Sequence, residues 1–78
     1  MFLVDQSFLE GTFRLRTEYI PLCDLLKACD IAETGGLAKL LIADGEIQVD
    51  GTVELRKRAK IRPGQTVTGE GFKIHVVS

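Results

Sequence analysis

The sequence has no tryptophan, a single histidine and only two cysteines among its 78 residues. Cys23, Cys29 and His75 match no zinc-binding pattern, which needs four ligands at set spacings. On one predicted helix, the two cysteines would have α-carbons about 9 Å apart, whereas a disulfide spans roughly 7 Å at most. We therefore expect no metal, no cofactor and no internal disulfide.

The sequence also lacks any long hydrophobic run. No stretch approaches the roughly 18–20 apolar residues of a membrane span, and Met1–Asp5 lack the features of a secretory signal. A chain this short buries only about 60–65% of its unfolded surface, which leaves little room for an enclosed catalytic pocket. We predict one cytoplasmic domain over residues 1–78, with its function on an exposed face and no small-molecule substrate or membrane partner.

Basic and acidic residues are separated along the chain. Residues 1–54 carry 4 basic and 10 acidic side chains, and residues 55–78 carry 6 basic and 1 acidic, although the whole chain has a net charge of −1. A polyanion responds to the local field, because charges are screened beyond about 8 Å. The pattern predicts one cationic face.

The N-terminal half predicts an arm, a strand and two helices. Residues 1–11 show weak periodicity, typical of a loosely ordered arm, and residues 12–17 alternate like a half-buried strand. A helix can begin at Pro21, and a second helix is predicted from about Gly36 to Ala43, with Gly45 at its left-handed C-terminal position. The apolar positions expected on the inner faces are Leu22, Leu25, Leu26 and Cys29 in the first helix, and Leu37, Ala38, Leu40, Leu41 and Ile42 in the second.

The C-terminal half predicts short strands joined by tight turns. Asp50-Gly51 is typical of a hairpin turn and Pro63-Gly64 of a type II turn. Alternating apolar residues lie on both sides of these turns and again in residues 72–76. This order predicts an α+β fold, with two helices packed on one side of a small, mostly antiparallel sheet of four or five short strands.

Five cations occupy seven positions between the two turns, in the segment Arg56-Lys57-Arg58-Ala59-Lys60-Ile61-Arg62, which we call the basic run. Three of them are arginines, whose planar guanidinium matches phosphate oxygens. No acidic residue interrupts the run. A solvated loop is the alternative for any such run, but the flanking turns favour an ordered, displayed segment.

Both predicted helices offer further groups for an anion. Lys27 and Lys39 are the cations on their polar sides, and Thr34-Gly35-Gly36 precede the second helix, where free N–H groups can contact a phosphate. These residues form no P-loop, since no Gly-Lys-Ser/Thr follows. Tyr19 is expected to be half-buried at the strand-to-helix corner, and His75 to be a plain surface or edge residue.

Several short motifs occur together over residues 13–77. They are Leu25-Leu26-Lys27, Gly35-Gly36-x-Ala38-Lys39, Gly45-x-Ile47-x-Val49-Asp50-Gly51, Glu54-x-Arg56-Lys57-Arg58-x-Lys60 and Pro63-Gly64-Gln65-x-Val67. The combination resembles the RNA-binding domain of small-subunit ribosomal protein S-four (the αL RNA-binding motif), and more closely its bacterial stand-alone, YbcJ-like branch. The resemblance implies that the second helix and the following loop contact the RNA backbone. It places the contacts at Lys27, Lys39, Arg56, Lys57, Arg58 and Lys60, with Arg62 at the margin.

The expected function is therefore binding of structured RNA, with ribosomal RNA as the expected target and the ribosome as the expected association. Ribosomal members often carry basic residues at the start of the second helix, which this chain lacks before Lys39, so the weight shifts to Arg56–Lys60. No predicted helix suits a DNA major groove, which favours backbone and shape recognition. A protein adaptor that uses the same cations on an acidic partner is the alternative. An enzyme is not expected, because no nucleophile–base pair is present.

Overall fold

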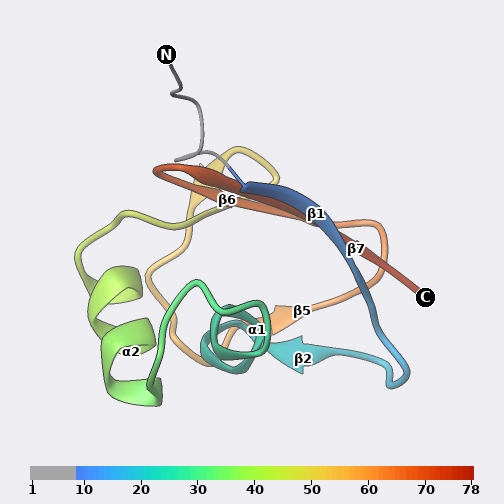
Figure 1. Ribbon diagram of the computed structural model, residues 1–78, viewed down its shortest axis with the longest axis horizontal. Helices are drawn as coiled ribbons and strands as arrows, with labels where there is room; N and C mark the ends of the chain where they lie inside the picture. Colours follow the sequence, from blue (N-terminus) through green and yellow to red (C-terminus); the bar gives the residue numbers. More distant parts are fainter. Residues whose placement is uncertain (1–8) are drawn as a thin grey trace, which may run out of the picture.

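The computed structural model describes residues 9–78 as a five-stranded sheet with two helices and a two-stranded sheet on one side of it (Figure 1). The large sheet has the strand order β1-β7-β6-β3-β4, and the small sheet pairs β2 with β5. The predicted α+β class, with both helices on one side of the sheet, is confirmed. The elements are β1 (Leu9–Arg14), β2 (Ile20–Pro21), α1 (Leu22–Ala28), α2 (Gly35–Ala43), β3 (Gln48–Val49), β4 (Thr52–Val53), β5 (Lys60–Ile61), β6 (Thr66–Gly69) and β7 (Phe72–Val77).

Strand β1 makes the large sheet mixed, because it runs parallel to β7 while the other pairs are antiparallel. The predicted boundary was wrong: Leu9–Gly11, assigned to a loose arm, begin this strand, which ends at Arg14 rather than Thr17. The edge of β7 supplies the hydrogen bonds for β1, and the local sequence cannot show such a distant partner. Residues 1–8 of the predicted arm lie outside the described residues.

Both helices end in a residue with left-handed backbone conformation. Gly45 has φ of +77° and donates its N–H to the Ile42 carbonyl at 3.1 Å, as predicted for a helix C-terminus. Asp30 has φ of +62° and ends α1 in the same way, so Cys29 follows the helix instead of lying within it. Both cysteines are free thiols. Neither helix of the described chain is long and apolar enough to cross a membrane.

The two predicted turns are present. Asp50 and Gly51 have φ of +52° and +86°, as a two-residue hairpin between β3 and β4 requires. Gly64 has φ of +97°, and the Gln65 N–H donates to the Arg62 carbonyl at 3.2 Å, which closes the turn at Pro63-Gly64. The basic run therefore begins shortly after one tight turn and ends at another.

The core lies between the large sheet and α1. Leu22, Leu25 and Leu26 of α1 are fully buried, as their spacing predicts. The apolar arc predicted for α2 was too wide, because only Ala38 and Ile42 are buried, while Leu37 is 42% and Leu40 58% exposed. Helix α2 lies at one end of the molecule and packs against α1 with a single face (Figure 1). Its outer leucines therefore have no second layer to cover them.

Candidate nucleic-acid interface

The backbone of the basic run is attached to the start of α1. The N–H groups of Leu22 and Cys23, which the helix itself cannot satisfy, donate to the carbonyls of Ala59 at 2.9 Å and Lys57 at 3.0 Å. In addition, Ile20 and Ile61 pair across β2 and β5. The run is thus an ordered segment rather than a solvated loop.

Burial within the run alternates. Ala59 and Ile61 are buried, and Ile61 belongs to the core beneath the large sheet. Residues two apart in an extended segment share a face, so anchoring these two apolar residues turns their neighbours outward. The cations that are exposed in this way are Arg58, Lys60 and Arg62.

Lys39 of α2 lies beside the basic run. It lines one open hollow together with Leu55 and residues 56–58, and Ala43 of the same helix contributes to the wall. A second hollow is lined by Arg56, Arg58, Ala59 and Lys60. One helix and the basic run therefore form a continuous cationic surface. We refer to the six cationic side chains of this surface as the basic patch. They are Lys39, Arg56, Lys57, Arg58, Lys60 and Arg62.

The other predicted contacts are less closely tied to this surface. Lys27 is exposed in the last turn of α1 and lines neither hollow. At the start of α2, the Thr34 Oγ1 accepts a hydrogen bond from the Leu37 N–H at 3.1 Å and so satisfies one of the free groups there. A β-carbon at Gly35 would meet no atom within 4 Å, so the surface over this turn is open. RNA contacts of Lys27 and residues 34–36 stay predictions.

Arg56 is paired with an acidic residue, contrary to the expectation of a run without neutralisation. Its Nε lies 2.9 Å from Glu54 Oε2, and its backbone N–H donates to the same oxygen at 3.1 Å. These side-chain and backbone hydrogen bonds lower the pKa of Glu54, and Glu54 raises the pKa of Arg56. The acid that neutralises Arg56 precedes the run by two positions and was missed because only residues inside the run were considered.

Replacing Glu54 with glutamine is expected to raise RNA affinity. The hydrogen bonds from Arg56 lower the pKa of Glu54 and so favour its ionised form, which pairs with Arg56 at neutral pH. One additional phosphate contact should strengthen binding roughly fivefold at 0.15 M salt and steepen the salt dependence by about 0.9. Glu10→Gln is the matched control, since Glu10 pairs instead with His75, at 2.9 Å on β1 and β7. Equal affinities for all three proteins would show that Glu54 does not mask Arg56.

Tyr19 is a second feature of this surface that sequence reasoning missed. The residue is 38% exposed and is not among the side chains packed against the core, contrary to the expected packing at a corner. The Lys60 Nζ lies 5.0 Å and the Arg62 Cζ 5.8 Å from the ring centroid. Tyr19 precedes β2, and the register that pairs Ile20 with Ile61 sets Tyr19 opposite Arg62. No local pattern could have indicated this arrangement, which depends on pairing across 40 residues of chain.

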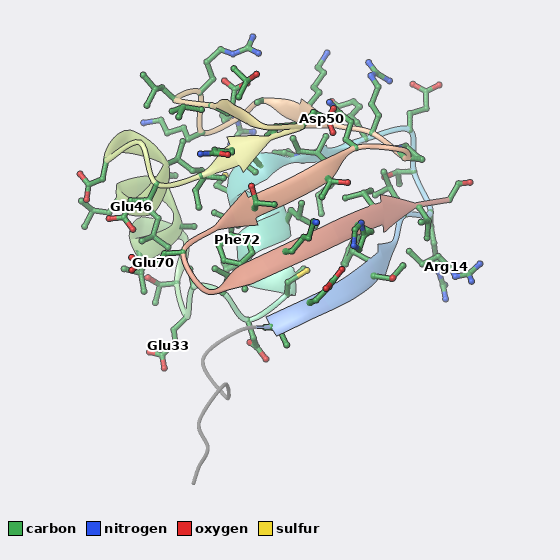
Figure 2. All side chains as sticks on the ribbon, turned by 90° about the horizontal axis from the view of Figure 1, so that it is seen from above. Arg14, Glu33, Glu46, Asp50, Glu70 and Phe72 are labelled. Atoms are coloured by element: carbon green, nitrogen blue, oxygen red, sulfur yellow. The ribbon has the colours of Figure 1, made fainter. Side chains whose placement is uncertain are left out.

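The charges separate in space as they do along the chain. Figure 2 shows most of the nitrogen-tipped side chains along the edge on which Asp50 lies, whereas Glu46, Glu70 and Glu33 lie at one end of the molecule. The Asp50 carboxylate already has a hydrogen-bond partner within the protein, because its Oδ1 accepts the Thr66 N–H at 2.9 Å. This bond ties the β3–β4 turn to the segment that follows the basic run. Apart from Glu54, which pairs with Arg56, these acidic residues leave the basic patch open to an anion.

His75 is a surface residue, as predicted, and it lies within hydrogen-bond distance of Glu10 on the outer face of the large sheet. The hydrogen bond with His75, with a smaller contribution from Lys73, lowers the pKa of Glu10. This pair lies on the edge strand β1 and its neighbour β7, and it shares no residue with the basic patch.

Comparison with known proteins agrees with this arrangement. YbcJ of Escherichia coli K12 is 48% identical over 69 residues, which cover 87% of this chain and 99% of that protein, and YbcJ of Shigella flexneri matches equally well. The solution structure of the E. coli protein, described as revealing an αL motif involved in RNA binding, matches with a TM-score of 0.69 over 86% of both chains. RlbA of Bacillus subtilis 168, named a probable ribosome maturation protein, is 36% identical over 56 residues, 72% of this chain and 79% of its own.

A family model gives the boundaries of the matching domain. The model described as the S4 domain matches residues 13–77, nearly the whole described chain and the same span over which the sequence motifs occur. The fold, the motifs and the relatives agree, and the chain belongs to the S4 domain family of RNA-binding proteins.

Proposed function

We propose that this protein binds structured RNA through the basic patch and recognises the shape and the sugar–phosphate backbone of its target. The observation that carries the proposal is the anchoring of the basic run to α1, which holds the exposed cations on an ordered segment beside Lys39. Arginines presented in this way suit phosphate oxygens, and phosphate contacts supply most of the affinity in such complexes. The relation to YbcJ and its αL motif supports the same role.

Ribosomal RNA is the target that we propose, and association with the ribosome the setting. The support is the relation to RlbA, whose name refers to ribosome maturation. We further propose that the protein has no catalytic activity of its own and acts in the cytoplasm. In this proposal Lys27 and the turn at Thr34-Gly35-Gly36 make secondary contacts, since they lie away from the hollows lined by the basic patch.

The salt dependence of binding tests the proposed function. Affinity for a structured ribosomal RNA fragment is measured at several salt concentrations between 50 and 300 mM, with tRNA as a second folded RNA. Neutralising about five phosphates should give a slope of log affinity against log salt near −4. A flat slope for both RNAs, or no binding at low salt, would contradict the proposal.

An adaptor that binds an acidic protein is the second candidate. The observation that favours it is Leu55, which is 61% exposed and lines the same hollow as Lys39 and Arg56. An apolar side chain beside cations suits a protein partner as well as RNA. Affinity purification with and without nuclease separates the two: a partner retained after nuclease treatment favours the adaptor, and one lost with the RNA favours the proposed function.

A further inference from the structure

Tyr19 is joined to the basic patch by two of its cations. Lys60 lies near its ring and also lines the hollow with Arg56 and Arg58, so the aromatic surface continues directly from the cationic one. In the two-stranded sheet, Ile20 and Ile61 pair and contribute to or pack against the core. By the alternation of extended strands, Tyr19, Lys60 and Arg62 then share the outer face.

The exposure of this ring is unusual for the protein. Among the aromatic residues of the described chain, Phe72 is buried and Phe13 is half-buried, whereas Tyr19 is exposed. The backbone of Tyr19 itself is held in place, because the Thr17 Oγ1 donates a hydrogen bond to the Tyr19 carbonyl at 2.9 Å. The ring therefore has a defined place at the margin of the basic patch without being needed in the core.

We infer that Tyr19 stacks on an unpaired base of the RNA whose backbone contacts Lys60 and Arg62. This inference rests on the proposed function and narrows its ligand to duplex RNA with an unpaired nucleotide beside it. Bases inside an A-form helix are stacked on each other and offer no face to a side chain, whereas a bulged or looped base does. Backbone contacts alone do not distinguish the two kinds of RNA.

The two cations do not prevent this contact. In the free protein they lie near the ring, but a cation–π contact at an exposed site is weaker than the stacking of a base on an aromatic ring. Phosphates of the bound RNA attract the ammonium of Lys60 and the guanidinium of Arg62 more strongly than the ring does. RNA binding thus exchanges two weak contacts for two ion pairs and one stacked base.

Two RNA hairpins that differ by one bulged nucleotide test the inference. The wild-type protein should bind the bulged hairpin about 5–20-fold more tightly, as expected for one stacked base. Tyr19→Leu should lose this preference while its affinity for the unbulged hairpin stays within about twofold, because Lys60 and Arg62 still supply the phosphate contacts. Tyr19→Phe retains the ring and should retain the preference.

The intrinsic fluorescence of the protein gives a second measurement, since the chain has one tyrosine and no tryptophan. Stacking should quench the tyrosine emission with the bulged hairpin and leave it nearly unchanged with the unbulged one, after correction for absorption by RNA. Equal binding of both hairpins by the wild type, or an undiminished preference in Tyr19→Leu, would overturn this inference alone. Failure to bind either hairpin would overturn the proposed function and this inference with it.

Discussion

Reversing the charge of Lys39, Lys57 and Arg58 is expected to weaken binding of structured RNA by about 100-fold at 0.15 M salt. These three side chains line one hollow and come from two separate elements, α2 and the basic run. Each phosphate contact contributes roughly a factor of five at this salt concentration through counterion release, and the slope of the salt dependence should decrease by about 0.9 per contact. Fluorescence anisotropy with a labelled hairpin at four salt concentrations measures both quantities.

A matched control separates the basic patch from total charge. Reversing Arg14, Arg16 and Lys73 changes the net charge from −1 to −7, as the first variant does, because each reversal removes two charges. Arg14 and Lys73 belong to the large sheet, and Figure 2 places Arg14 well away from the edge that carries Asp50. The control should retain most of the affinity. Similar losses in both variants would mean that RNA responds to net charge and not to this patch.

Replacing Gly69 with alanine is expected to destabilise the fold by about 1–3 kcal/mol, the usual cost of forcing atoms into a filled core. Gly69 pairs with Phe72 across β6 and β7. A β-carbon at Gly69 would lie 2.8 Å from Cζ of the Phe72 ring and 3.1 Å from the Glu46 carbonyl oxygen. The ring is buried and the oxygen belongs to the backbone, so neither can move aside freely.

Thermal unfolding followed by circular dichroism measures this effect. For a domain of this size, 1 kcal/mol lowers the Tm by roughly 4–8 °C, so a fall of about 5–20 °C is expected. Gly11→Ala is the control, because a β-carbon there meets no atom within 4 Å, and its Tm should change little. In Phe72→Leu, whose smaller side chain leaves room, adding Gly69→Ala should cost much less than it does in the wild type. Additive losses would contradict a clash between this pair.

Local sequence predicted most of the fold because the signals were short-range. The turn at Asp50-Gly51, the helix end at Gly45 and the buried leucines of α1 depend on residues only a few positions apart. The start of β1 was predicted wrongly because this strand pairs with β7, which is distant in sequence. The exposure of Leu40 was predicted wrongly because no element of the described chain covers the outer side of α2. The same limit applies to Gly69, which in the sequence is only a glycine near a turn.

The basic run was identifiable as a candidate site from composition alone, but its geometry was not. Sequence could not show that Lys39 lines the same hollow as the run, or that Lys60 and Arg62 lie over the Tyr19 ring. The first depends on how the run lies beside α2, and the second on how β5 pairs with β2.

The amino-acid sequence by itself determined the class of fold, the position of the cations along the chain and the family. These follow from periodicity, turn residues and motif spacing, which are local properties of the chain. The tertiary structure decided which cations share a surface and which aromatic ring adjoins them. Hydrogen bonds from the start of α1 to the carbonyls of Lys57 and Ala59 join segments more than 30 residues apart, and only that contact turns a charged stretch into an ordered surface.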